Sequence, residues 1–169
     1  MQRIAKFHKV SEKQFQKDWM DTFGENGDDI HRIYESIRLP KRATAGSAGY
    51  DFYAPVRIVL KPGETVKIPT GVRVEMEDNW VLKCYPRSGL GFKYRLQLNN
   101  TVGIIDSDYF YSDNEGHMFA KITNDTNEEK NVEIKAGDGF MQGIFVEYGI
   151  TVDDAVTDIR NGGFGSTTK

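Results

Sequence analysis

The feature that most constrains the fold is a series of short β-type runs, closed by turn residues, that begins after Pro40. The runs read DFYAPVRIVL, TVKIP, GVRVEM, WVLKCYP, HMFAKIT, NVEIKAG and GFMQGIFVEYGI, with turns such as KPGE, PTG and EDN between them. In GVRVEM, apolar residues alternate with Arg73 and Glu75, which predicts a strand with one buried face. Many short strands without an internal repeat favour an all-β sandwich or barrel over a parallel sheet crossed by helices.

The first forty residues predict a different local structure. MQRIAKFHKV is compatible with a first strand, and residues 11–24 predict a helix, with Ser11 and Gln14 as a capping box and Gly24 at its end. The expected apolar faces are Phe15, Trp19, Met20 and Phe23 in this helix, and Ile30, Ile33, Tyr34 and Ile37 in a second. We expect this helical insert, residues 11–37, to form a packing or oligomer surface rather than a catalytic site.

Composition excludes several classes of protein. The 169 residues are enough for one domain, and 38% apolar residues are enough for a core. No apolar run is long enough to cross a membrane, and the first residues show no secretory signal pattern. The net charge of −3 argues against general nucleic-acid binding. The single cysteine, Cys84, excludes an internal disulfide, so we expect a reducing, cytoplasmic environment.

Common nucleotide and metal motifs are missing from the sequence. It contains neither GxxxxGK[ST] nor a strand–GxGxxG–helix pattern, and its three histidines and one cysteine lack zinc-site spacing. Asp106 and Asp108 begin like a calcium loop, but Phe110 occupies the third ligand position and excludes that interpretation.

Three segments are unusually polar for a β protein. PRSGLG combines Arg87 with a hydroxyl and glycine amides, which suits phosphate, although a surface turn also explains it. NNTVGIIDSDYF delivers Asp106 from an apolar strand end, where a partly buried carboxylate needs a partner or a catalytic role; a turn-capping aspartate is the alternative. AGSAGYDFY surrounds Asp51 with small residues, as a bulged strand start also would.

These segments, with two others, occur in a particular order. AGSAGYDF, PRSGLG, VGIIDSDY, GDGFMQ and GGFGST resemble, in sequence and spacing, the five motifs of the trimeric dUTPase family, between residues 45 and 167. Each motif is modest alone, but five in order are specific. The resemblance implies one domain over residues 1–169, with a β jelly-roll (β-clip) fold, forming a homotrimer with shared active sites. It also implies Mg²⁺-dependent hydrolysis of dUTP to dUMP and pyrophosphate, which keeps uracil out of DNA.

The resemblance assigns a role to each motif. Asp106 would hold the attacking water against the α-phosphorus and accept its proton as the bond forms, because a carboxylate is too weak a base to deprotonate water beforehand. Asp51 would bind waters of the Mg²⁺ shell, so no protein side chain would bind the metal directly. The phosphates would be bound by Arg87, Ser88, Gly89 and Gln142.

A hairpin over residues 100–106 would recognise the nucleoside. Its backbone and the Asn100 side chain would read uracil, and cytosine would be rejected roughly 10²- to 10⁴-fold because two hydrogen-bonding positions are reversed. Tyr109 would lie under the deoxyribose and exclude a 2′-hydroxyl; a core tyrosine is the alternative. The base contacts would come from Asn100, Gly103, Ile104, Ile105 and, through the alignment of Gly116, Phe119.

The C-terminal glycine-rich segment would act as a mobile arm, residues 160–169. Phe164 would stack on uracil, while Arg160, Gly165, Ser166 and Thr167 would meet the phosphates. The chain also departs from the family pattern. Gly139 stands where a basic residue is usual, only Asn161 separates the arginine from GGFG, and residues 110–136 form a longer connection.

Two other functions fit parts of the sequence. A dCTP deaminase shares the fold but should carry a catalytic glutamate beyond the hairpin, for which we find no counterpart. A dUTPase-like protein that binds a regulatory protein partner is permitted by the helical insert and the long connection. Neither nucleic acid nor a membrane is expected as a partner.

Overall fold

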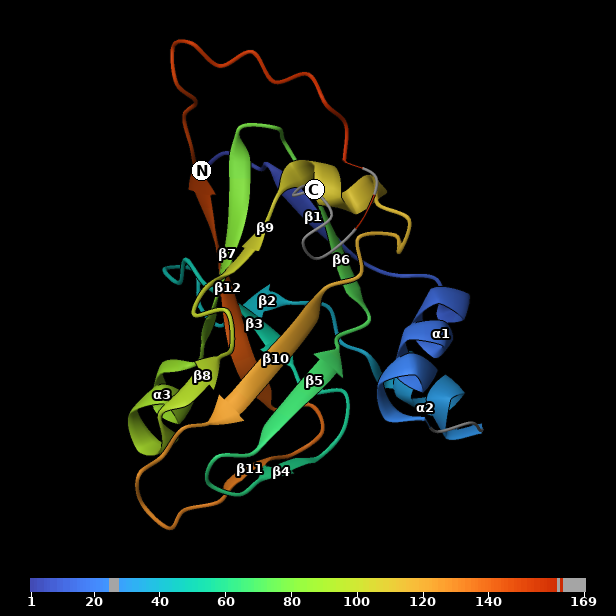
Figure 1. Cartoon of the computed structure of the whole chain (residues 1–169), viewed down its shortest axis with the longest axis vertical. Coiled ribbons are helices and arrows are strands. Elements are labelled where there is room, and N and C mark those ends of the chain that lie inside the picture. Colours follow the sequence, from blue (N-terminus) through green and yellow to red (C-terminus); the bar gives the residue numbers. More distant parts are fainter. Residues whose placement is uncertain (25–27, 161, 163–169) are drawn as a thin grey trace.

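The computed structural model describes residues 1–24, 28–160 and 162 (Figure 1), and within them the chain is mostly β-sheet. The helices are α1 (Glu12–Phe23), α2 (Asp28–Ser36), α3 (Ser88–Tyr94) and the 3₁₀ helix η1 (Ser107–Tyr111). The first strands are β1 (Ala5–Lys9), β2 (Lys41–Arg42), β3 (Tyr50–Tyr53), β4 (Ile58–Leu60), β5 (Thr65–Pro69) and β6 (Val72–Met76). The later strands are β7 (Trp80–Pro86), β8 (Leu96–Leu98), β9 (Gly103–Ile105), β10 (Phe119–Asn124), β11 (Val132–Ile134) and β12 (Gly139–Glu147).

The central sheet has the strand order β2-β3-β12-β7-β9, and its described pairs are antiparallel. Its long middle strand, β12, places Gln142 between Asp51 of β3 and Tyr85 of β7. The register of β12 against β3 shifts between Gly139 and Met141, close to where β7 leads into α3. Four of the five sequence motifs therefore contribute residues to this one sheet.

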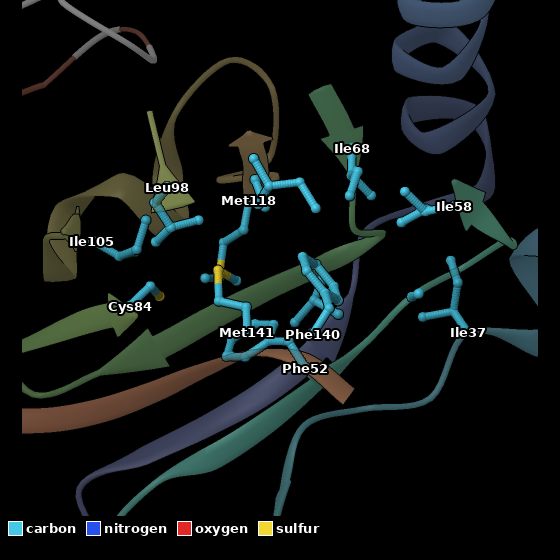
Figure 2. Packing of buried hydrophobic residues seen from close by; sticks show 14 of the residues in the cluster. Ile37, Phe52, Ile58, Ile68, Cys84, Leu98, Ile105, Met118, Phe140 and Met141 are labelled. Carbon is cyan, nitrogen blue, oxygen red and sulfur yellow. The ribbon is translucent and has the colours of Figure 1, made fainter. Parts of the chain in front are cut away.

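A second sheet, with the order β5-β10-β8, packs against the central one. Figure 2 shows Phe52, Phe140 and Met141 of the central sheet facing Met118 and Leu98 across the core. All five side chains are buried. The core thus lies between two sheet faces, and β-sheet predominates, as expected from the short β-type runs of the sequence.

The predicted alternation in β6 is also confirmed. Val72, Val74 and Met76 are buried, and Glu75 is exposed. β1 pairs antiparallel with β6, so the first strand expected from the sequence covers this edge. β4 and β11 form a separate two-stranded pair at one end of the molecule (Figure 1).

Helix α1 begins and ends where the sequence predicts. The Ser11 side chain accepts a hydrogen bond from the Gln14 amide, and Gly24 ends the helix at φ 67°. The reciprocal half of the predicted capping box is wrong. The Gln14 side chain binds Asp18 at 2.8 Å, and the Ser11 backbone N–H donates instead to Glu115 at 2.7 Å, because a carboxylate is the stronger acceptor.

The two N-terminal helices lie together on one side of the sheets (Figure 1). Phe15 and Trp19 of α1 are buried, whereas Met20 is 42% exposed, so its expected place on the buried face is wrong. Ile30 of α2 and Ile37, just after it, are buried. In the part of the chain that the structure describes, no helix is long and apolar enough to cross a membrane.

Candidate functional site

The segment PRSGLG joins the end of β7 to the start of helix α3, so the surface turn considered as its alternative interpretation is wrong. Arg87 has extended backbone (φ −64°, ψ 138°), and its carbonyl accepts hydrogen bonds from the amides of Leu90 and Gly91. β7 runs directly into this helix, so Arg87 is held at the end of a central strand. A helix can form here because Leu90 and Tyr94 pack against the core on one side.

Arg87 lies between the first and fourth motifs. Its Nε is 3.4 Å from a carboxylate oxygen of Asp51, and a Cβ placed on Gly139 would be 2.9 Å from its Nη1. The glycine at position 139 therefore gives the guanidinium its space. Gln142 is close by, and its amide donates to the carbonyl of Pro86 at 3.4 Å. The structure brings together the arginine, the carboxylate and the amide to which the family resemblance assigns phosphate and hydrated metal.

The predicted hairpin borders a cavity of about 590 Å³. Strands β8 and β9 flank a turn in which Thr101 has φ 66°. The cavity lining includes the predicted base contacts Asn100, Gly103, Ile104, Ile105 and Phe119. A cavity of this size, with apolar walls and a few polar groups, is typical of small-ligand sites.

Sequence reasoning missed several residues of this cavity. Lys67 and Lys121 line it and stand directly opposite each other on β5 and β10. Met141 and Cys84, which are both buried, also line it. Burial raises the pKa of the Cys84 thiol to about 12, which leaves it unsuited to act as a nucleophile. The matched lysine positions could have been found only with the strand register, which the sequence does not state.

Asp106 follows the last residue of β9 directly, as predicted, and its side chain is 47% exposed. Arg160 binds it, with Nη2 to Oδ2 at 2.5 Å, and also binds Asp108, with Nε to Oδ1 at 2.9 Å. The guanidinium carbon of Arg160 lies 5.9 Å from the centre of the Tyr109 ring. Arg160, the arginine that precedes the glycine-rich motif, therefore meets the candidate catalytic carboxylate, although the two are 54 positions apart.

Tyr109 is buried in the middle of the 3₁₀ helix η1, which begins directly after Asp106. Its hydroxyl donates to the carbonyl of His117 at 2.7 Å and accepts from the side chain of Asn114 at 2.9 Å. Burial raises its pKa, so it stays a protonated donor. The ring is thus fixed in orientation by two hydrogen bonds.

The remaining predicted tail contacts, Phe164, Gly165, Ser166 and Thr167, lie outside the described residues. Within the described residues, no group of three or more histidine, cysteine, aspartate or glutamate side chains is placed to hold a metal ion.

Fold and site together define a class: a mostly β protein with two polar clusters at opposite ends of β7. Arg87, Asp51 and Gln142 lie at the end of this strand, and Asp106 with Arg160 lies beside its start, next to the strand that lines the apolar cavity. Residues 35–168 match the model of the dUTPase family. The deoxyuridine 5′-triphosphate nucleotidohydrolase of Lactococcus lactis is 44% identical over 134 residues, covering 78% of this chain and 88% of the relative. The corresponding protein of Haemophilus influenzae is 39% identical over 146 residues, covering 82% and 92%. The chain belongs to the dUTPase family.

Solved structures agree with this assignment. The dUTPase of Streptococcus mutans superposes with a TM-score of 0.63 at 33% identity, covering 88% of this chain and 98% of that one. The dUTPase of Staphylococcus bacteriophage 80alpha, solved with dUPNHPP, gives 0.64 at 21% identity over 98% of both chains, which supports the fold alone. The family match begins at residue 35, so α1 and most of α2 lie outside it.

Proposed function

We propose that the chain hydrolyses dUTP to dUMP and pyrophosphate, and so acts in nucleotide metabolism by limiting uracil in DNA. One observation carries this proposal. The strand that ends directly before Asp106 supplies Gly103, Ile104 and Ile105 to the cavity wall. A base held against this strand by main-chain groups would place its phosphates within reach of the carboxylate that follows it. The family match supports the same reaction.

In this mechanism Asp106 orients water toward the α-phosphorus and accepts its proton as the new bond forms. Most of the rate enhancement then comes from alignment and from charge neutralisation around the phosphates. Arg87 offers a fork of N–H donors at the end of β7. Ser88 and Gly89 follow it at the start of α3, and Gln142 lies opposite Tyr85 on the neighbouring strand. Arg160, which binds Asp106 and Asp108, is the arginine that would turn to the phosphates when dUTP is bound.

The residues around Asp51, near the end of β7, fit a hydrated Mg²⁺ ion. Asp51 is a largely buried carboxylate on β3, opposite Gln142, and carboxylate oxygens suit the waters that Mg²⁺ keeps. When bound, the metal would supply charge neutralisation of the triphosphate. Asp51 would hold the metal's waters, and the neighbouring Arg87 would bind phosphate oxygens.

Selection of the base and sugar follows from the cavity and from Tyr109. The hairpin amides and Asn100 would accept uracil, and Phe119 would contact the base across the cavity. The buried ring of Tyr109 would leave no room for a 2′-hydroxyl. Phe164, Gly165, Ser166 and Thr167 would close over the nucleotide as part of a mobile arm; this stays a prediction.

We further propose a jelly-roll homotrimer with shared sites, in which residues 11–37 form an addition to the common domain. Exposed apolar side chains support the proposed association of subunits. Ile150, Val152, Val156 and Ile159 lie on an extended segment after β12 and are largely exposed in the single chain. A neighbouring subunit that covered them would remove this apolar surface from water. A cytoplasmic location and a regulatory protein partner also stay predictions.

The proposed reaction is tested by measuring pyrophosphate release from dUTP, dCTP, UTP and dTTP, with Mg²⁺ or with excess chelator. We expect release from dUTP alone, and only with Mg²⁺. Ammonia release from dCTP would instead support the deaminase alternative. Absence of pyrophosphate from dUTP with folded protein would refute the proposed function.

A further inference from the structure

A buried hydrogen-bonded pair joins the N-terminal helices to the rest of the domain. Asp18 of α1 and His117, just before β10, lie with Oδ2 and Nδ1 2.5 Å apart. The His117 side chain is 0% exposed and that of Asp18 is 12% exposed. A polar pair this deeply buried needs both of its hydrogen-bonding partners in place.

The hydrogen bond at the second ring nitrogen of His117 shows which partner donates in the bond between His117 and Asp18. The backbone N–H of Gly71 donates to Nε2 at 2.8 Å, so Nε2 is an acceptor and the proton lies on Nδ1, where Asp18 accepts it. Burial by itself would raise the pKa of Asp18, but hydrogen bonds from His117 and Gln14 outweigh it and lower the pKa. The imidazole is therefore held from both sides.

His117 in turn contacts the nucleotide site in two ways. Its carbonyl oxygen accepts the hydrogen bond of the Tyr109 hydroxyl at 2.7 Å. Its ring centre lies 4.7 Å from that of Phe119, which lines the hairpin cavity. A change in the position of His117 would therefore move together the two rings that we propose contact the sugar and the base.

We propose that Asp18 is a positioning residue for the nucleotide site, acting through His117 on the rings of Tyr109 and Phe119. This rests on the proposed function, because it assigns Tyr109 the task of excluding a 2′-hydroxyl. It gives the helical segment a role in substrate selection, although the segment lies outside the family match and contributes none of the motif residues.

The proposal predicts a specific defect. Without the carboxylate of Asp18, the Nδ1–H group of His117 is buried without its acceptor. The imidazole ring is then expected to move until Nδ1–H reaches another hydrogen-bond acceptor. Because Tyr109 depends on the His117 carbonyl, the space below the sugar opens. We expect KM for dUTP to rise about tenfold, kcat to change by less than about threefold, and the preference for dUTP over UTP to fall about tenfold.

The experiment compares three substitutions on α1. Asp18→Leu removes the acceptor, and Asp18→Asn keeps a side-chain oxygen that can accept from Nδ1. Glu12→Leu is the matched control, because Glu12 pairs with His31 at 2.6 Å on the exposed side of the same helix. For each variant, kcat and KM are measured with dUTP and UTP, and thermal unfolding is followed. We expect the loss of discrimination in Asp18→Leu, its recovery in Asp18→Asn, and wild-type values in Glu12→Leu.

The outcomes separate the possible failures. If the wild-type protein does not hydrolyse dUTP, the proposed function is wrong. If it does, and Asp18→Leu is less stable but keeps KM and the dUTP preference, Asp18 is only structural and the inference is overturned. If Asp18→Leu does not fold, Tyr109→Phe tests the other end of the link. Wild-type discrimination in Tyr109→Phe would also overturn the inference.

Discussion

The strand-end site contains the pairs Asp106–Arg160 and Asp51–Arg87, and the region beneath α1 contains the pair Asp18–His117. Both regions depend on paired charged or polar groups, but the pairs differ in burial. Asp106 is about half exposed where it meets Arg160, whereas His117 is completely buried where it meets Asp18. An exposed pair can exchange its partner for a ligand or for water at small cost. A buried pair cannot, because the remaining group is left without a partner. Substitutions in the first region should therefore change turnover, and those in the second should change stability and geometry.

The largest expected effect is on turnover, at Asp106. Asp106→Asn removes the proton acceptor but keeps the size and one hydrogen-bonding oxygen of the side chain. We expect kcat to fall about 10³-fold, with little change in the unfolding temperature because the Asp106 side chain is 47% exposed. Pyrophosphate release and thermal unfolding measure the two quantities.

Asp108→Asn is the matched control for Asp106→Asn. Asp108 pairs with the same arginine at 2.9 Å and is similarly exposed, at 49%. We expect its kcat to stay within about fivefold of wild type. Equal losses in the two variants would assign the effect to Arg160, and near-normal turnover in Asp106→Asn with intact dUTP binding would refute the role of Asp106.

The next effect is on stability, at Gly71, which donates to His117. Gly71 has φ 72°, and a Cβ there would collide with Cδ1 of Ile37. Gly71→Ala should lower the free energy of unfolding by about 3 kcal/mol, combining backbone strain and overpacking. Gly63→Ala is the control, because Gly63 has φ 82° but open space around its Cβ position. It should cost only about 1 kcal/mol. Equal costs in urea unfolding would show that crowding at Ile37 is unimportant.

The two regions also differ in how far the sequence predicts them. The strand-end site could be predicted because its polar segments are local: Asp106 follows a recognisable apolar strand, and PRSGLG is a continuous segment. The buried pair could not, because Asp18 and His117 are 99 positions apart and each looks like an ordinary surface residue in its own segment.

Long-range contacts also explain the predictions that were wrong. Glu115 replaced Gln14 as the acceptor for the Ser11 amide across 104 positions, and no local pattern indicates this contact. The segment after Arg87 forms a helix because the core covers Leu90 and Tyr94, despite two glycines. The alternation in β6 and the two end residues of α1, Ser11 and Gly24, were predicted correctly, because each depends on residues within one element.

A smaller effect is expected on folding stability at acidic pH. The pKa of Asp18 is lowered below its ordinary value of 3.8, because the hydrogen bonds from His117 and Gln14 outweigh burial. A depressed carboxyl pKa stabilises the fold above the unfolded pKa, and this stabilisation is lost as pH falls through the folded pKa. Urea unfolding between pH 6 and pH 3 should show a steeper acid loss in wild type than in Asp18→Asn. Parallel curves would show that the pair does not contribute to acid sensitivity.

The smallest effect is expected at a surface pair that resembles the strand-end pairs in exposure but has no role in the site. Arg57 and Glu133 lie 3.0 Å apart, with side chains 65% and 51% exposed. Arg57→Gln should change the free energy of unfolding by less than about 0.5 kcal/mol and leave kcat unchanged, because water and salt screen such pairs. Urea unfolding at low and high salt measures this. If the substitution cost as much as Gly71→Ala, exposure would not separate the two kinds of pair, and the contrast between the strand-end site and the buried pair would lose its physical basis.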